Sequence, residues 1–245
     1  MCYMIVILSS DDSYFLEYWP IVHLAWEKFF PEWELKLAHI TIEPRSQGII
    51  HDLPLIPHIP TANLAKMARY YLASLQDKEV CIIHDIDSAP LNRDYGLRLL
   101  SQRQSGKLMA VGAEVYIHTQ HAGKYPTSWM MAEGKIFQQL FNPRQLEWSD
   151  LVKSWIGMKR YDHKEDISAP ANIFSDESLL RALIGTNNPL VQYVNRDVDI
   201  QKEWLDRSWW DDKKHPSKFI EVNFLRPPRG DNLVRMLPVY QYVMQ

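Results

Sequence analysis

The sequence VCIIHDIDSAP, residues 80–90, joins an apolar run to a pair of aspartates, and the fold prediction starts from it. Val80–Ile83 predicts a buried β-strand, because a short continuous apolar run suits a strand that is covered on both faces. Asp85 and Asp87 follow at the carboxyl end of this strand, the edge at which open α/β sheets bind ligands. Side chains two residues apart on an extended backbone point to one side, so both carboxylates can converge on one divalent cation.

The composition indicates a soluble protein with a small-molecule partner. The chain has 245 residues, 46% of them hydrophobic, which is enough for one compact α/β domain over residues 1–245. A net charge of -3 provides no electrostatic footprint for nucleic acid, and no apolar run is long enough for a membrane span. The two cysteines, Cys2 and Cys81, favour a reducing compartment, so we expect a cytoplasmic location. The oligomeric state is left open.

The segments before residue 80 predict alternating strands and helices. Tyr3–Leu8 is expected to form the first strand, with a polar loop at residues 9–12, and Glu34–Ile40 a second strand. Thr41–Pro60 is expected to be a loop, in which His51 and its polar neighbours are solvated because their spacing matches no metal-ligand motif. A helix is predicted over Asn63–Gln76. This order predicts a mixed, mostly parallel sheet flanked by helices.

Basic residues of that helix are candidates for binding an anionic ligand. Lys66 and Arg69 are three residues apart and therefore share one surface of the helix. In a parallel α/β arrangement the first half of this helix can lie near the carboxyl ends of the strands. An ordinary solvent-exposed basic face is the alternative, because most surface lysines and arginines have no other role.

The sequence FSDESLL, residues 174–180, is the second motif with chemical content. Asp176 and Glu177 are predicted in the first turn of a helix, where carboxylates interact favourably with the helix dipole. The interaction with the helix dipole is by itself a sufficient explanation for both carboxylates. The alternative is that one of them faces the ligand and interacts with an acceptor hydroxyl. Upstream, Ala132–Phe141 is predicted to be a helix as well.

Further candidates lie towards the C-terminus. His215 is either a solvated loop residue or a distal ligand that completes a metal site with the aspartate pair. Arg207, Arg226 and Arg229 are candidates for neutralising a diphosphate. The chain has neither a Walker loop nor a GxGxxG fingerprint, so a cation together with basic side chains would have to neutralise the phosphates.

Four motifs in this order resemble the nucleotide-sugar glycosyltransferases of the GT-A fold: ILSSDD at residues 7–12, AKxxR at 65–69, HDIDS at 84–88 and FSDESLL at 174–180. The compact size is similar, more narrowly, to the small glycosyltransferase domains of large algal viruses, which would place the protein in the host-cell cytoplasm. The resemblance implies a GT-A-like fold, with a nucleotide-sugar-binding half over about 1–112 and an acceptor-side half over about 113–245.

The same resemblance implies an activity and roles for particular residues. The enzyme would transfer a sugar from a nucleotide-diphosphate donor, expected to be a UDP-sugar, to a hydroxyl of a glycan or other acceptor. Asp85 and Asp87 would bind Mn²⁺ or Mg²⁺ through the donor diphosphate, and His215 would correspond to the C-terminal histidine that closes the metal site in that family. The remaining implied residues are Ser9, Asp11, Lys66, Arg69 and Asp85 for the nucleotide sugar, and Asp176, with Glu177 as its substitute, for the acceptor.

Two other functions remain open at this point. A haloacid-dehalogenase-type phosphatase also uses a DxD pair, but that family carries it on the first strand, with Thr or Val where this chain has Ala89. A non-catalytic module that binds sugars or nucleotides through its aromatic residues is the third candidate. Metal-dependent hydrolysis of a sugar nucleotide would favour the transferase, an aspartyl-phosphate intermediate the phosphatase, and binding without turnover the module.

Overall fold

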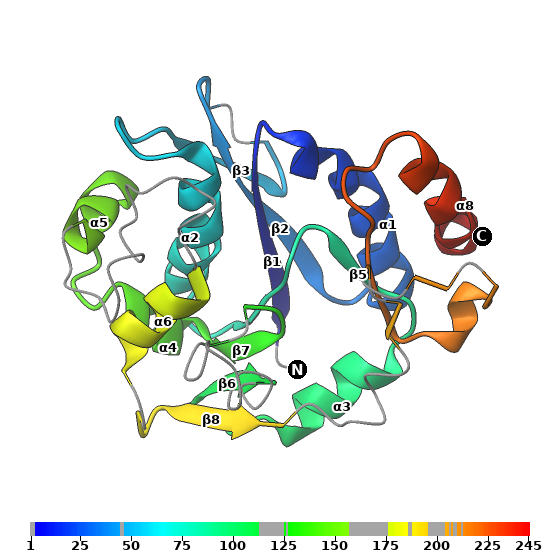
Figure 1. The fold of residues 1–245 in the computed structure, drawn as a ribbon. Helices are drawn as coiled ribbons and strands as arrows, with labels where there is room; N and C mark the ends of the chain where they lie inside the picture. The colour runs from blue at the N-terminus through cyan, green and yellow to red at the C-terminus, as the bar shows by residue number, and fades with distance from the viewer. Residues whose placement is uncertain are drawn as a thin grey trace.

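The structure is a computed structural model that describes residues 3–44, 47–112, 125, 127–156, 176–185, 188–195, 204–205, 207, 210–211 and 213–245. Its centre is a seven-stranded sheet with the strand order β3-β2-β1-β4-β7-β6-β8 (Figure 1). The strands are β1 Met4–Asp11, β2 Glu34–Thr41, β3 Ile50–Pro54, β4 Val80–Ile83, β6 Leu108–Val111, β7 Met130–Glu133 and β8 Val191–Val194. All neighbouring strands pair in parallel except β7, which is antiparallel to β4 and β6. The predicted mixed, mostly parallel sheet is therefore confirmed.

Helices cover both faces of this sheet, and a second, three-stranded sheet with the order β5-β10-β9 lies beside it. Its strands are β5 Ser88–Pro90, β9 Trp204–Leu205 and β10 Glu221–Asn223. The described α-helices are α1 Trp19–Phe29, α2 Thr61–Ser74, α3 Asp94–Gln102, α4 Gly134–Phe141, α5 Trp148–Trp155, α6 Asp176–Ile184 and α8 Asp231–Met244, with 3-10 turns at Tyr14–Tyr18 and Pro216–Lys218. No helix in this part of the chain is long and apolar enough to cross a membrane.

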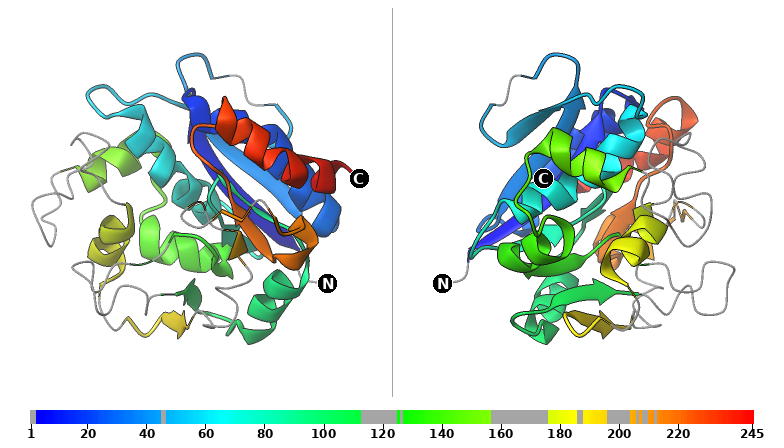
Figure 2. Two further views of the ribbon diagram at one scale, coloured as in Figure 1. Left: turned by 45° about the vertical axis from the view of Figure 1, so that its right-hand side comes forward. Right: turned by 90° about the vertical axis from the view of Figure 1, so that its left-hand side faces the viewer.

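Alternation along the central strands divides the interior into two cores. In β1, Ile5 and Ile7 point into a core that includes residues of α2, α4, α5 and α6. Val6 and Leu8 point to the opposite face, where residues of α1, α3, α8 and the second sheet form the other core. Figure 2 shows α8 packed beside α1 on that face. Because both faces of the sheet are covered, its central strands consist of continuous apolar runs.

The first predicted loop is wrong, because β1 continues to Asp11. Ser9, Ser10 and Asp11 are all buried, and each pairs with a residue of β2. Backbone hydrogen bonding to a neighbouring strand does not require apolar side chains, so the polar run did not end the strand. The practical effect is that these polar side chains are held on a rigid strand end.

Two other sequence predictions were also wrong. Residues 50–54 form the edge strand β3 inside the expected loop Thr41–Pro60. Met130–Glu133 forms β7, so the helix expected over Ala132–Phe141 begins only at Gly134. Short apolar runs suit a buried strand as well as a buried helix, and in β7 the pairing with β4 and β6 decides the outcome. Strands from both predicted halves share the central sheet, and the functional division near residue 112 stays a prediction.

Glu133, the last residue of β7, is held by several hydrogen bonds. Its Oε1 accepts from Arg103 Nη1 at 2.7 Å and from Ser105 Oγ at 2.9 Å, while Oε2 accepts from the Gly106 N–H at 3.1 Å. Burial alone would raise the pKa of this carboxyl, but these hydrogen bonds lower the pKa from 4.5 to about 2. The ionised form therefore ties β7 to the turn after α3.

We predict that Glu133→Gln lowers the free energy of unfolding at pH 7 by on the order of 2 kcal/mol, as expected when hydrogen bonds to a charged group are lost. A carboxyl with a depressed folded-state pKa contributes fully above its unfolded pKa, and the contribution is lost as the pH falls towards the folded-state value. The difference between wild type and variant should therefore narrow between about pH 5 and pH 3 in urea unfolding experiments. Glu27→Gln, at an exposed position on α1, is the control. A difference that does not change with pH would contradict the prediction.

Candidate functional site

A cavity of about 470 Å³ lies at the carboxyl ends of β1 and β4. Four parts of the chain form most of its wall: the end of β1, the first half of α2, the residues that follow β4, and two arginines from the C-terminal part. The residues that line it are Ser9, Ser10, Asp11, Phe15, Ala62, Ala65, Lys66, Arg69, Asp85, Ile86, Asp87, Thr127, Glu177, Arg207 and Arg226. Both acidic and basic side chains thus face one space.

Most of the residues singled out in the sequence are brought together here. Of the predicted site residues, the cavity is lined by Ser9, Asp11, Lys66, Arg69, Asp85, Asp87 and Glu177. Asp176 is the first residue of α6, and its side chain lies outside the part of the chain that the structure describes. His215 is not among the lining residues. It precedes a 3-10 turn, where its Nδ1 accepts from the Ser217 N–H at 3.3 Å and its ring lies edge-on to Tyr242.

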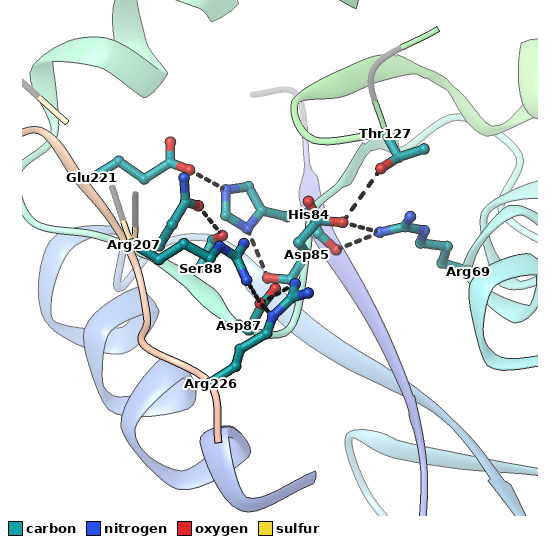
Figure 3. Close-up of polar contacts among 10 residues, drawn as sticks. Arg69, His84, Asp85, Asp87, Ser88, Thr127, Arg207, Glu221 and Arg226 are labelled. Carbon is teal, nitrogen blue, oxygen red and sulfur yellow. Dashed lines mark hydrogen bonds and ion pairs between the residues drawn. The ribbon is translucent and has the colours of Figure 1, made fainter. Parts of the chain in front are cut away.

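Asp85 is paired with an arginine of α2. Arg69 Nη1 donates to Asp85 Oδ1 at 2.7 Å and to the carbonyl oxygen of His84 at 3.1 Å, and Thr127 Oγ1 lies 3.4 Å from the same carboxylate oxygen (Figure 3). Burial would raise the pKa of Asp85, but the Arg69 guanidinium outweighs burial and holds this pKa below its ordinary value. Asp85 is therefore ionised at neutral pH. The surface shared by Lys66 and Arg69 faces the cavity rather than bulk solvent alone.

Asp87 is covered by two further arginines. Its side chain is only 3% exposed, and its Oδ2 accepts from Arg207 Nη1 at 2.6 Å and from Nε and Nη2 of Arg226. The Arg226 guanidinium also lies over the Phe15 ring, 4.8 Å from its centroid. Arg229, the third arginine considered from the sequence, instead forms an exposed ion pair with Glu17. Figure 3 shows Arg207 and Arg226 approaching the same carboxylate.

A buried polar pair lies behind the two aspartates, and the sequence did not indicate it. His84 is fully buried, with its Nε2 3.5 Å from Glu221 Oε1 of β10, and its Nδ1–H donates to the Asp85 carbonyl oxygen at 3.2 Å. Trp129 Nε1 donates to Glu221 Oε2 at 2.6 Å, and the rings of Trp26 and Trp129 lie edge-on to the imidazole. Burial lowers the pKa of His84, but Glu221 outweighs it and raises that pKa above its ordinary value. The pair fastens the DxD segment to the second sheet.

Local hydrogen bonds also fix the nearby end of β1. Asp11 Oδ2 accepts from Thr61 Oγ1 at 2.7 Å, and Asp11 Oδ1 accepts from the Ser13 N–H at 3.2 Å. Next to it, His39 lies between two carboxylates, at 3.0 Å from Asp12 and 2.9 Å from Asp52. The start of α2 is therefore tied to the carboxyl end of β1 at the cavity wall.

Asp85 and Asp87 are two neighbouring carboxylates of the cavity wall that could hold a divalent cation. Carboxylate oxygens suit Mg²⁺ or Mn²⁺, and such ions usually complete their coordination with substrate phosphates and water. Among the described residues, no three His, Cys, Asp or Glu side chains are grouped so that they could hold a metal by themselves. The donor set thus fits a cation that enters together with a phosphorylated ligand.

Comparison with solved structures places the fold among glycosyltransferases. The galactosyltransferase LgtC in complex with donor and acceptor sugar analogues matches with a TM-score of 0.50 and 13% identity, over 98% of this chain and 95% of LgtC. GlyE from Streptococcus pneumoniae TIGR4 matches with a TM-score of 0.53 and 10% identity, over all of this chain and 61% of GlyE. No family model and no curated protein sequence matches.

The chain therefore has the GT-A glycosyltransferase fold, as the motifs implied. The shared feature is the architecture, because the sequences themselves are only 10 to 13% identical. The narrower similarity to domains of large algal viruses stays a prediction.

We predict that Asp87→Asn destabilises the protein by on the order of 2 kcal/mol, because it leaves two arginines without their buried carboxylate partner. The matched control is Glu17→Gln, which removes an arginine pair whose members are 67% and 38% exposed. Exposed pairs contribute about 0 to 1 kcal/mol, so this variant should unfold almost like the wild type. Urea unfolding of the three proteins measures both effects. Equal stabilities of the two variants would show that the Asp87 pairs do not stabilise the fold.

Proposed function

We propose that this protein is a metal-dependent glycosyltransferase that moves a sugar from a nucleotide-diphosphate donor to a hydroxyl of a glycan or other acceptor. The observation that carries the proposal is the convergence of Asp85, Asp87 and Arg69 in one cavity at the carboxyl ends of the strands. The GT-A fold supports it, since both the LgtC and the GlyE neighbours are glycosyltransferases. UDP is the nucleotide that we expect, and a cytoplasmic location is part of the proposal.

The main task at the donor end is to neutralise a leaving diphosphate. Among the described residues, four basic side chains face the cavity: Lys66, Arg69, Arg207 and Arg226. Arginine can bind phosphate oxygens through two parallel hydrogen bonds, and lysine acts as a point charge. Asp85 and Asp87 would hold Mn²⁺ or Mg²⁺, which supplies further positive charge next to the phosphates when it is bound. Ser9 and Asp11, which line the cavity at the end of β1, would contact the nucleoside.

At the acceptor end, a carboxylate from the first turn of α6 meets the reacting hydroxyl. Glu177 lines the cavity, and Asp176 precedes it on the same helix. In the transfer, the acceptor oxygen forms a bond to the anomeric carbon while the bond from that carbon to the diphosphate oxygen breaks. In an inverting reaction the carboxylate accepts the hydroxyl proton. In a retaining reaction it positions the substrate, and the leaving diphosphate oxygen accepts that proton.

The phosphatase alternative fits the structure less well. That family carries its DxD pair on the first strand, whereas Asp85 and Asp87 follow β4. No observation favours it over a transferase. A non-catalytic module that binds sugar nucleotides would need the same cavity as a transferase. The two functions are therefore distinguished by whether the bound sugar nucleotide is turned over.

Our first functional prediction concerns donor binding. UDP and UDP-sugars with Mn²⁺ should raise the melting temperature, because a ligand at 100 times its Kd stabilises the folded state by about 2.7 kcal/mol. For a chain of this length that corresponds to a shift of roughly 5 to 10 °C. A thermal-shift screen of nucleoside diphosphates and their sugars, with Mn²⁺ or with EDTA, measures it. The proposed function fails if no nucleotide shifts the melting temperature under either condition.

The same donor binding should be measured in Asp85→Ala, which removes one carboxylate of the pair. Calorimetry should then show that Mn²⁺ no longer increases the affinity for UDP, whereas Glu27→Ala, on the exposed surface of α1, should behave as the wild type. An unchanged Mn²⁺-dependent affinity in Asp85→Ala would refute the role assigned to the pair.

The second functional prediction separates acceptor chemistry from donor binding. Asp176→Asn or Glu177→Gln should lower kcat by about 100-fold or more, the usual contribution of a general acid or base, while UDP affinity is kept. Steady-state kinetics with the sugar nucleotide that emerges from the screen, together with UDP calorimetry, provides both values. If both variants keep full transfer activity, neither carboxylate acts on the acceptor.

A further inference from the structure

Asp87 presents an arrangement that a metal-binding carboxylate would have to change. Its side chain is 3% exposed, whereas those of Arg207 and Arg226 are 31% and 40% exposed. Both arginines line the cavity and both bind the same oxygen, Oδ2. They therefore cover the carboxylate on its cavity side.

A divalent cation and two guanidinium groups compete for such a carboxylate. A cation at Asp87 would stand next to two like charges in a partly buried site, where the repulsion is weakly screened. Asp85 is in a similar position, because its Oδ1 is paired with Arg69. The ion pairs seen here and full occupancy by a metal are thus alternative states of the same carboxylates.

The two arginines have a natural second partner in the proposed reaction. The planar guanidinium matches a phosphate as well as a carboxylate, so it can move from one to the other without losing its hydrogen bonds. Phe15 lies under the Arg226 guanidinium and also lines the cavity, so the stacking contact offers a surface along which this side chain can shift.

We propose that Arg207 and Arg226 exchange partners during donor binding. Without ligand they neutralise Asp87, and they transfer to the donor's phosphate oxygens when the cation takes the carboxylate. The proposal rests on the proposed function and adds a coupling to it: the cation binds weakly alone and tightly with the nucleotide. By linkage, the nucleotide must then bind more tightly in the presence of the cation by the same factor.

The test measures Mn²⁺ affinity of the ligand-free protein by electron paramagnetic resonance of the free ion, with no activity assay. Arg207→Gln and Arg226→Gln should each bind Mn²⁺ about tenfold more tightly than the wild type, because a competing like charge is removed. With saturating Mn²⁺, both should bind UDP more weakly in calorimetry. A purely structural role of the arginines would not raise metal affinity.

Arg229→Gln is the matched control, since Arg229 belongs to the same segment as Arg226 but pairs with the exposed Glu17. It should change neither affinity. Arg226→Lys, which keeps the charge, should leave Mn²⁺ affinity near that of the wild type. If Arg226→Gln does not fold, the proposal is tested with Arg207→Gln alone.

The proposal is overturned if Mn²⁺ affinity is unchanged or lower in both glutamine variants, or if none of the proteins binds Mn²⁺ measurably. In either case the two arginines do not compete with a cation for Asp87. A failure of the proposed function is recognised separately, by the absence of any nucleotide-induced shift in the thermal screen.

Discussion

Two aspartates separated by one residue repel each other, and much of this structure neutralises that repulsion. Arg69 reaches Asp85 from α2, while Arg207 and Arg226 reach Asp87 from the C-terminal part of the chain. These ion pairs connect segments on different sides of the cavity. The ion pairs of one short loop therefore tie α2 and the C-terminal segments to the end of β4.

The loop that carries Asp85 and Asp87 is also held by a contact with the second sheet. His84 and Glu221 form a buried pair, and Trp129 donates a hydrogen bond to the other oxygen of the carboxylate. A buried pair of this kind contributes little net stability compared with apolar packing, but removing one member leaves an unpaired charge and is costly. Its effect here is positional, because it joins the residue that precedes Asp85 to β10 of the second sheet.

The sequence predicted those parts of the fold and site that depend on local patterns. Val80–Ile83 is the β4 strand, and Lys66 and Arg69 face the cavity because the spacing on α2 is purely helical. Prediction was poorer where partners lie far apart in the chain: Asp87 meets Arg207 across 120 residues, and Arg226 across 139. Such contacts depend on the return of the chain to the sheet, which no local spacing encodes. The same reason explains why Ala132 and Glu133, the last two residues of β7, were assigned to the following helix.

The late position of Arg207 and Arg226 has a consequence for how the molecule is made. During synthesis from the N-terminus, β1, α2 and β4 are complete long before either arginine has been added. Arg69 is then the basic partner of the acidic loop, and Asp87 is without the two side chains that later cover it. The segment from Arg207 to Gln245 therefore does more than add β10 and α8 to the fold. It also brings the two arginines that cover Asp87 in the folded protein.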